Sequence, residues 1–266
     1  VLGMKKFQKR FYFVQDYETV LINTNDGVVL SGWWMETDKN APTIIGLHGV
    51  TSGKHSPDVL LVGGMLVSEG FNYLTFDFRD HGESTCEDGV HSAGQKEIYD
   101  VKAAIDWLVN EKNIPPDKIG LHGSSFGAMV ALMAQYASDD ISALSIVDTP
   151  FDFATLVREE LIYQGFPPFL YEPVNHYALL FEGIDITEVS PEDGVSKGKN
   201  PMIIFNGIKS DRVLSHHTDD LINAGNQYNV EMLINRYPEL SHTEIMFVYP
   251  DEFLSKIVPF FRERLN

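Results

Sequence analysis

The sequence predicts an α/β domain built on a mostly parallel β-sheet with helices on both of its faces. Short apolar runs alternate with amphipathic segments along most of the chain, and polar residues follow directly after several of the apolar runs. Strands that alternate with helices are joined by crossovers, which keep neighbouring strands parallel and cover both faces of the sheet. With 266 residues, 44% of them hydrophobic, the chain can bury a sizeable core. We therefore expect one domain over residues 1–266.

Eight segments have the pattern of β-strands. Two lie near the N-terminus on either side of the turn sequence Asn25-Asp26-Gly27, which predicts an antiparallel hairpin. The other six are short apolar runs, which are typical of buried parallel strands. The eight segments are residues 10–14, 28–35, 42–47, 71–77, 118–122, 143–148, 201–206 and 230–237.

Helices are expected between these strands. Residues 57–69 form the first, which Gly70 closes, and residues 97–111 have apolar side chains at spacings of three and four. Another helix begins around Ser125. A closing helix starts near Pro250, and Pro259 inside it is expected to kink or restart it, because proline lacks the N–H that continues a helix.

Residues 151–199 interrupt the alternation of strands and helices. This segment contains no strand pattern and is dense in aromatic residues. Because it follows directly after a predicted strand, it should lie over the ligand-binding edge of the sheet. We interpret it as a small helical cap over the active site.

Composition and charge exclude several classes of function. The formal net charge of −18 argues against nucleic-acid binding, since phosphates require a basic surface. The single cysteine, Cys86, rules out an intramolecular disulfide and gives no support for secretion. The basic start of the chain lacks the apolar run of a signal peptide, and no apolar run approaches the ~20 residues that span a bilayer. We expect a cytoplasmic protein without a membrane span; the sequence leaves its oligomeric state open.

The stretch Gly123-Ser124-Ser125-Phe126-Gly127 predicts a nucleophile. It matches G-x-S-x-G, and it stands between a predicted strand and an apolar helix. A strand that turns abruptly into a helix needs small residues two positions before and after the turning residue, and it exposes that residue's side chain. Ser125 is therefore the candidate nucleophile, and the hydroxyl of Ser124 should point elsewhere.

A serine hydroxyl needs a base, and the base needs an acid. His242 lies after the last predicted strand and before the final helix, in a loop at the ligand-binding edge. Asp211 follows the strand at 201–206 and is the candidate acid; Asp148, after the preceding strand, is the alternative. Ionisation of His242 should produce an acidic limb of activity near pH ~6–7.

Two backbone N–H groups should stabilise the oxyanion that forms during acyl transfer. One is that of Phe126, at the start of the helix after the nucleophile. The other should come from the loop after the third strand, where Gly49 allows the backbone to turn inward, and we assign it to Val50.

Taken together, these stretches resemble the α/β-hydrolase superfamily, most closely its esterase and serine-peptidase-like branch with a short cap. The resemblance rests on six stretches in the order of the family: residues 47–52, 76–84, 99–108, 123–127, 205–213 and 240–242. It implies an α/β-hydrolase fold with an eight-stranded sheet, and Ser125, Asp211 and His242 as the catalytic triad. One departure concerns the acid: three residues separate Asn206-Gly207 from Asp211, where the family often has two.

The function predicted is that of a serine hydrolase that needs no cofactor and no metal. We expect a carboxylesterase that cleaves small-molecule esters with short to medium acyl chains, or aryl esters, through an acyl-enzyme. An aminopeptidase-like peptidase is the alternative, with Glu159-Glu160 as anchor for a substrate amine. A thioesterase or acyltransferase would share the catalytic residues. A non-catalytic binding protein on the same fold is the remaining alternative.

Overall fold

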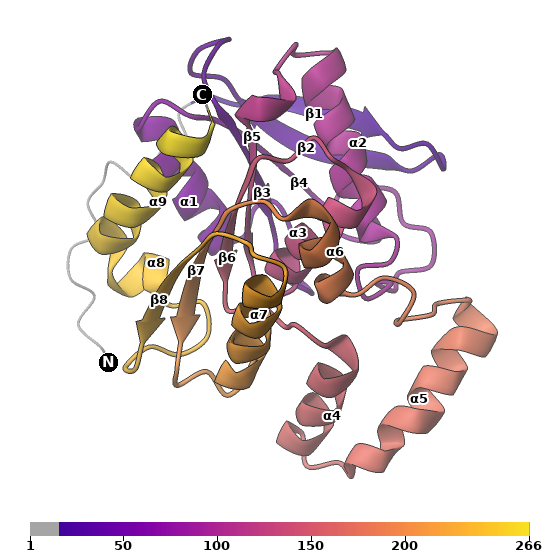
Figure 1. Ribbon diagram of the computed structural model, residues 1–266. Helices are drawn as coiled ribbons and strands as arrows, with labels where there is room; N and C mark the ends of the chain where they lie inside the picture. Colours follow the sequence, from indigo (N-terminus) through magenta and orange to yellow (C-terminus); the bar gives the residue numbers. More distant parts are fainter. Residues whose placement is uncertain (1–15, 266) are drawn as a thin grey trace.

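The computed structural model describes residues 16–265, apart from the side chains of residues 181 and 182. An eight-stranded sheet forms the centre of the molecule, in the order β1-β2-β4-β3-β5-β6-β7-β8 (Figure 1). β1 is antiparallel to β2 and β2 to β4, whereas all other neighbours are parallel. The strands are β1 (Glu18–Asn23), β2 (Val29–Met35), β3 (Thr43–Leu47), β4 (Asn72–Phe76), β5 (Ile119–Ser124), β6 (Ala143–Val147), β7 (Met202–Gly207) and β8 (Met232–Tyr237). The predicted fold class is confirmed.

The N-terminal hairpin is present, with its turn at residues 24–28. Its first strand is β1, which directly precedes the turn. The strand expected at residues 10–14 lies outside the described residues. The sequence of β1 alternates buried and exposed residues, as an outer strand with one covered face does.

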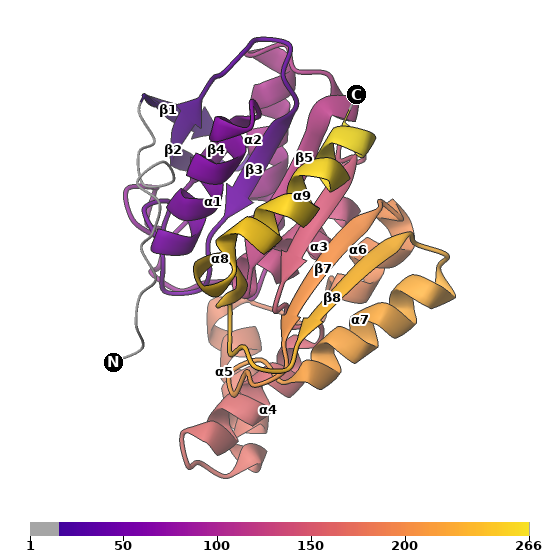
Figure 2. The same cartoon turned by 90° about the vertical axis from the view of Figure 1, so that its left-hand side faces the viewer.

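Helices cover both faces of the sheet, and each face has its own apolar core (Figure 2). On one face lie α1 (Pro57–Ser68), α8 (Ile245–Val248) and α9 (Pro250–Arg264). On the other lie α2 (Glu97–Asn110), α3 (Phe126–Ala137), α6 (Pro191–Gly198) and α7 (Ser215–Gln227). The central strands β3, β4, β5, β6 and β7 are buried along their whole length, which explains their continuous apolar sequences.

The carboxyl ends of the six parallel strands, from β4 to β8 across the sheet, lie along one edge. The last residue of β3, Leu47, pairs with Gly123 near the end of β5, and Ser124 pairs with Val147 at the end of β6. The series continues through β7 to β8, whose last residues are paired with each other. The loops that follow these strands therefore lie side by side, which is where ligands bind in open parallel sheets.

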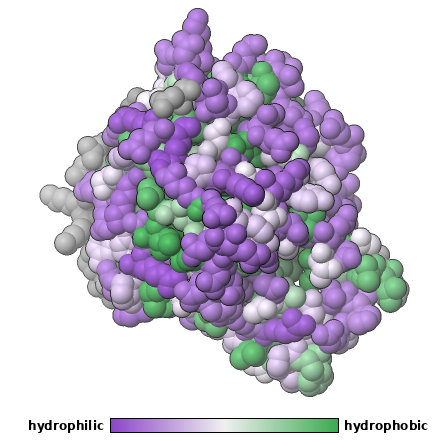
Figure 3. All heavy atoms as spheres, in the orientation of Figure 1, coloured by the Kyte–Doolittle hydropathy of each residue, from purple (hydrophilic) through white to green (hydrophobic). Residues whose placement is uncertain are grey.

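The segment between β6 and β7 is helical, as expected. It contains α4 (Phe153–Tyr163), a short 3₁₀ turn at Pro168–Leu170, α5 (Tyr171–Tyr177) and a π-helical turn at Ala178–Glu182 before α6. α4 and α5 project from the body (Figure 1). Green patches at the lower right of Figure 3 mark apolar surface in this region. The exposed large apolar side chains from α4 to the π-helical turn are Ile162, Tyr163, Phe166, Phe169, Val174, Tyr177, Leu179 and Leu180. α6, by contrast, packs so closely on α3 that a Cβ at Gly194 would lie 2.0 Å from the Leu132 carbonyl oxygen.

Helix α9 continues through Pro259, so of the two expected effects of this proline, a kink or a restart, the restart does not occur. Pro259 lies on the exposed side of α9, between the buried residues Val258 and Phe260. Because the ring faces solvent, the carbonyl of Ser255 that loses its N–H partner is on the side where water can replace it. Among residues 16–265, no helix is both long enough and apolar enough to cross a bilayer.

Candidate active site

Ser125 occupies a strained turn between β5 and α3. Its φ of +55° and ψ of −122° are unusual for a residue with a side chain, and its N–H donates to the carbonyl of Val147. The flanking glycines are obligatory, since a Cβ at Gly123 would lie 2.4 Å from the Gly127 carbonyl, and one at Gly127 would lie 2.3 Å from the Leu47 carbonyl oxygen. Ser125 is half-buried, whereas Ser124 is buried and its hydroxyl has no protein partner.

Ser125 and His242 line the same pocket, which has a volume of about 650 Å³. Val50 and Phe126 line it as well, so the pocket brings together four of the five predicted site residues. Within the described residues, neither the N–H of Val50 nor that of Phe126 donates a hydrogen bond to protein. Both amides are therefore free to bind an oxyanion.

The loop that carries Val50 is fixed by buried polar groups. The Nε2 atom of His48 accepts a hydrogen bond from the Phe78 N–H at 3.0 Å. The carboxylate of Asp77 accepts from the N–H of Lys54 at 2.7 Å and from its ammonium at 2.5 Å, and both side chains are almost fully buried. These contacts hold the loop after β3 against the loop after β4.

The group that contacts Nδ1 of His242 is a serine. The Oγ atom of Ser210 lies 3.3 Å from it, and Ser210 is buried. Asp211, the candidate acid, is exposed, and within the described residues no hydrogen bond joins it to His242. The negative charge of Asp211 nevertheless favours the imidazolium form of His242 and so raises its pKa. Sequence reasoning missed Ser210, although its spacing from Gly207 is the one that the family often uses for the acid.

Asp148 holds the loop that carries His242 in place through hydrogen bonds. One of its oxygens accepts from the Asn206 amide at 3.0 Å and from the Gly207 N–H at 2.8 Å, and the other accepts from the Thr243 N–H at 2.7 Å. Burial raises the pKa of Asp148 to about 6 against the effect of these three donors. Asp148 thus ties the loop after β7 to the loop after β8.

The environment of His242 disfavours its charged form. Burial and, second, the positive charge of Arg212 lower its pKa to about 4, while Asp211 opposes them. With this pKa, we expect the acidic limb of activity near pH 4 and not near the pH 6–7 predicted from the sequence. The sequence could not supply this value because it depends on how deeply the ring is buried.

The walls of the pocket come largely from apolar side chains. Helix α4 contributes Phe153, Leu156 and Val157, and the body contributes Val213 and Phe247. One ion pair crosses from the insertion to the body at the pocket, between Glu160 and Arg212 at 3.1 Å. The carboxylate of Glu160 is thus already paired, with the guanidinium of Arg212.

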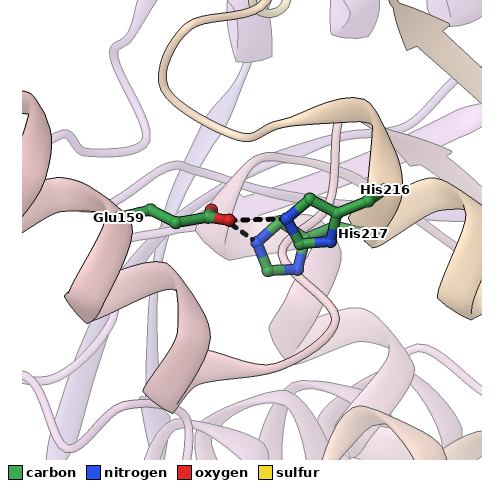
Figure 4. A group of neighbouring side chains, drawn as sticks. All are labelled: Glu159, His216 and His217. Carbon is green, nitrogen blue, oxygen red and sulfur yellow. Dashed lines mark hydrogen bonds and ion pairs between the residues drawn. The ribbon is translucent and has the colours of Figure 1, made fainter.

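Glu159, the neighbour of Glu160, faces two adjacent histidines at the start of α7 (Figure 4). Its carboxylate lies 2.5 Å from Nε2 of His216 and 3.1 Å from Nε2 of His217. One ligand atom from each residue falls within 4.8 Å of the others, so the trio has the atoms for a divalent metal. However, Nδ1 of His217 accepts a hydrogen bond from the Phe151 N–H, so its Nε2 carries a proton and donates to Glu159. We therefore interpret the trio as a hydrogen-bonded clamp between α4 and α7.

The family model of the prolyl oligopeptidase family matches residues 63–266, more than three quarters of the chain. The chain belongs to the prolyl oligopeptidase family. Its curated relatives include the uncharacterized protein YqkD of Bacillus subtilis, 28% identical over 73% of this chain and 64% of YqkD. Another is the polyketide transferase ATR5 of Stachybotrys chlorohalonatus, 26% identical over 91% of this chain and 82% of that protein.

The fold of this prolyl oligopeptidase family member is that of the α/β-hydrolases. The esterase Pf2001 of Pyrococcus furiosus superposes on it with a TM-score of 0.77 at 27% identity, covering 94% of this chain and 91% of that one. These comparisons support a hydrolase of the esterase or peptidase type. They leave the bond that it cleaves open, and the match spans less than two thirds of YqkD.

Proposed function

We propose that this protein is a serine hydrolase that acts on small-molecule esters of apolar acids. The observation that carries the proposal is Ser125 in its strained turn, in one pocket with His242 and with two unengaged amides. His242, held neutral by burial, accepts the proton of Ser125 as the hydroxyl attacks the ester carbonyl. The amides of Val50 and Phe126 bind the oxyanion and lower the barrier by about 3 kcal/mol each.

The second half of the reaction uses the same groups. The protonated His242 gives its proton to the departing alcohol, which leaves an acyl group on Ser125. His242 then takes a proton from water, the hydroxide attacks the acyl-enzyme, and the carboxylic acid is released as Ser125 regains its proton.

Ester substrates are favoured over peptides by the state of the two glutamates on α4. An aminopeptidase would need a free carboxylate to bind a substrate amine, but Glu159 is engaged by two histidines and Glu160 by Arg212. The apolar walls suit an acyl or aryl group. Transfer of the acyl group to an acceptor other than water is the second candidate, because the relative ATR5 is named a polyketide transferase. A cytoplasmic location stays a prediction.

The first test compares Ser125→Ala with Ser124→Ala. We expect Ser125→Ala to lower kcat on p-nitrophenyl butyrate by more than about 10³-fold and to abolish labelling by a fluorophosphonate probe, with an unchanged unfolding temperature. Ser124→Ala is the matched control and should retain labelling. Loss of labelling in Ser124→Ala but not in Ser125→Ala would refute the assignment. A series of ester chain lengths beside aminoacyl anilides and acyl thioesters then tests the substrate class.

A further inference from the structure

The contact between Ser210 and His242 is unusual for a histidine base. In a serine–histidine–acid triad, one carboxylate does two things: it accepts the Nδ1 proton, which fixes the tautomer and the ring, and its charge stabilises the imidazolium. Here the atom at Nδ1 is a neutral hydroxyl oxygen, and the neighbouring carboxylate of Asp211 is exposed.

The backbone of the loop after β7 fixes Ser210 in this place. The N–H of Ser210 donates to the Gly207 carbonyl, and that of Lys209 donates to the Leu240 carbonyl at 2.9 Å, two residues before His242. Gly207 lies so close to the same segment that a Cβ would be 2.3 Å from the Ser241 carbonyl oxygen. The position at Nδ1 of His242 therefore belongs to residue 210, and the next residue turns outward.

The hydroxyl of Ser210 has the capacity for this role. Its oxygen has two lone pairs, and the Val213 N–H, 3.1 Å away, takes one of them. The second can accept the Nδ1 proton of His242. With the proton on Nδ1, the Nε2 atom is the unprotonated one, as a base for Ser125 requires.

We propose that Ser210 and Asp211 divide the work of the triad acid, Ser210 orienting the His242 ring and Asp211 supplying negative charge without contact. This inference rests on the proposed roles of Ser125 and His242. Asp148, the other carboxylate nearby, has both oxygens occupied by the Asn206, Gly207 and Thr243 donors, so it holds the two loops in register.

The test uses three variants of the full chain: Ser210→Ala, Ser210→Thr and Asp211→Asn. For each, kcat and KM on p-nitrophenyl butyrate are measured as a function of pH. Ser210→Ala should lower kcat by about 10- to 100-fold at unchanged KM, as part of the roughly 10²–10⁴-fold that a positioned base contributes. Ser210→Thr keeps the hydroxyl and should restore most of the activity. These two variants leave the charge around His242 unchanged, so the acidic limb should stay in place.

Asp211→Asn should move the acidic limb and change kcat little, the reverse of what is expected for Ser210→Ala. Removing the negative charge lowers the pKa of His242, so the acidic limb should move to lower pH while kcat on the plateau falls by less than about tenfold. A contacting triad acid would instead cost roughly 10⁴-fold. Such a loss in Asp211→Asn, or full activity in Ser210→Ala, would overturn the division of work. Ser125→Ala separates the two proposals: if it stays active and fluorophosphonate-labelled, the proposed function itself fails, whatever residue 210 does.

Discussion

At the scale of the residue, the protonation of His242 is decided by its surroundings. The ring is buried, and the guanidinium of Arg212 adds to the burial in lowering its pKa, whereas Asp211 acts against both. With a pKa of about 4, the imidazole is neutral throughout the range near pH 7. The proposed base therefore needs no deprotonation before it can accept the proton of Ser125.

Arg212→Gln should move the acidic limb of kcat/KM to higher pH. The substitution removes a positive charge near His242 and leaves Glu160 unpaired, and both changes favour the imidazolium. The measurement is the pH profile of ester hydrolysis from pH 3.5 to 7, within the range in which the circular dichroism spectrum is constant.

Arg236→Gln is the matched control for this experiment. Arg236 pairs with Asp219 on α7 and is absent from the residues that line the active-site pocket. Its replacement should leave the limb in place. An acidic limb that stays put in Arg212→Gln, or shifts downward, would contradict the electrostatic account of His242.

At the scale of the element, the turn from β5 into α3 depends on the absence of side chains. Gly123→Ala places a methyl group against the backbone of Gly127, 2.4 Å away, where only a shift of the helix start can make room. We expect a loss of at least about 2 kcal/mol in the free energy of unfolding, as overpacking of a rigid site produces. Urea denaturation measures it.

Gly49→Ala gives the comparison for Gly123→Ala. Its added Cβ meets the Ser124 carbonyl oxygen only at 4.0 Å, which is ordinary van der Waals contact. Its unfolding free energy should change by less than about 0.5 kcal/mol. Equal effects of the two substitutions would show that the crowding at the turn is not what fixes it.

The elements that could be predicted from the sequence are those whose signal is local. The buried strands from β3 onward are continuous apolar runs that end in glycine or polar residues, and their observed limits differ from the predicted ones by at most two residues. The restart expected at Pro259 does not occur, because the effect of the proline depends on which side of α9 faces solvent. Ser210 was missed because a shift of one residue in this loop decides whether Ser210 or Asp211 is buried. That choice depends on the packing of Gly207 against Ser241, which the sequence does not show.

At the scale of the whole molecule, acidification acts on buried histidines, three of which have the most strongly lowered pKa values. Burial lowers their pKa values to about 4, 3 and 4, for His48, His122 and His242. In the unfolded chain these histidines take up protons near pH 6.5, whereas in the folded chain they stay neutral down to about pH 4. Protonation therefore favours the unfolded chain, and the stability that the buried neutral rings provide above pH 6.5 is lost as the pH falls toward 4. Two buried aspartates act in the opposite sense below pH 6, since burial raises the pKa of Asp100 and Asp148 to about 6.

Burial also lowers the pKa of His91 and His217. Hydrogen bonds to Glu159 and Asp220, by contrast, outweigh burial and raise the pKa of His216. Histidines with lowered pKa values therefore outnumber the buried groups with raised ones, and unfolding should take up protons between pH 6 and 4. The free energy of unfolding should therefore fall as the pH drops through this range. Urea midpoints at pH 7 and pH 5 should show lower stability at pH 5. The comparison is made in 0.5 M NaCl, which screens the repulsion from the net charge of −18. An equal or higher midpoint at pH 5 would contradict the prediction.

The segment between β6 and β7 contributes only side walls to the pocket. Ser125, His242 and the proposed amides belong to the body, where Phe126 is the first residue of α3. Among the described residues, α4 is tied to the body by the Glu160–Arg212 ion pair at the pocket and by the contacts of Glu159 with His216 and His217 beside it. We therefore expect that another sequence in place of α4 and α5, if it keeps Glu159 and Glu160, would select a different acyl group and leave the reacting atoms in place. In this protein, the segment that selects the acyl group is therefore distinct from the residues that cleave the bond.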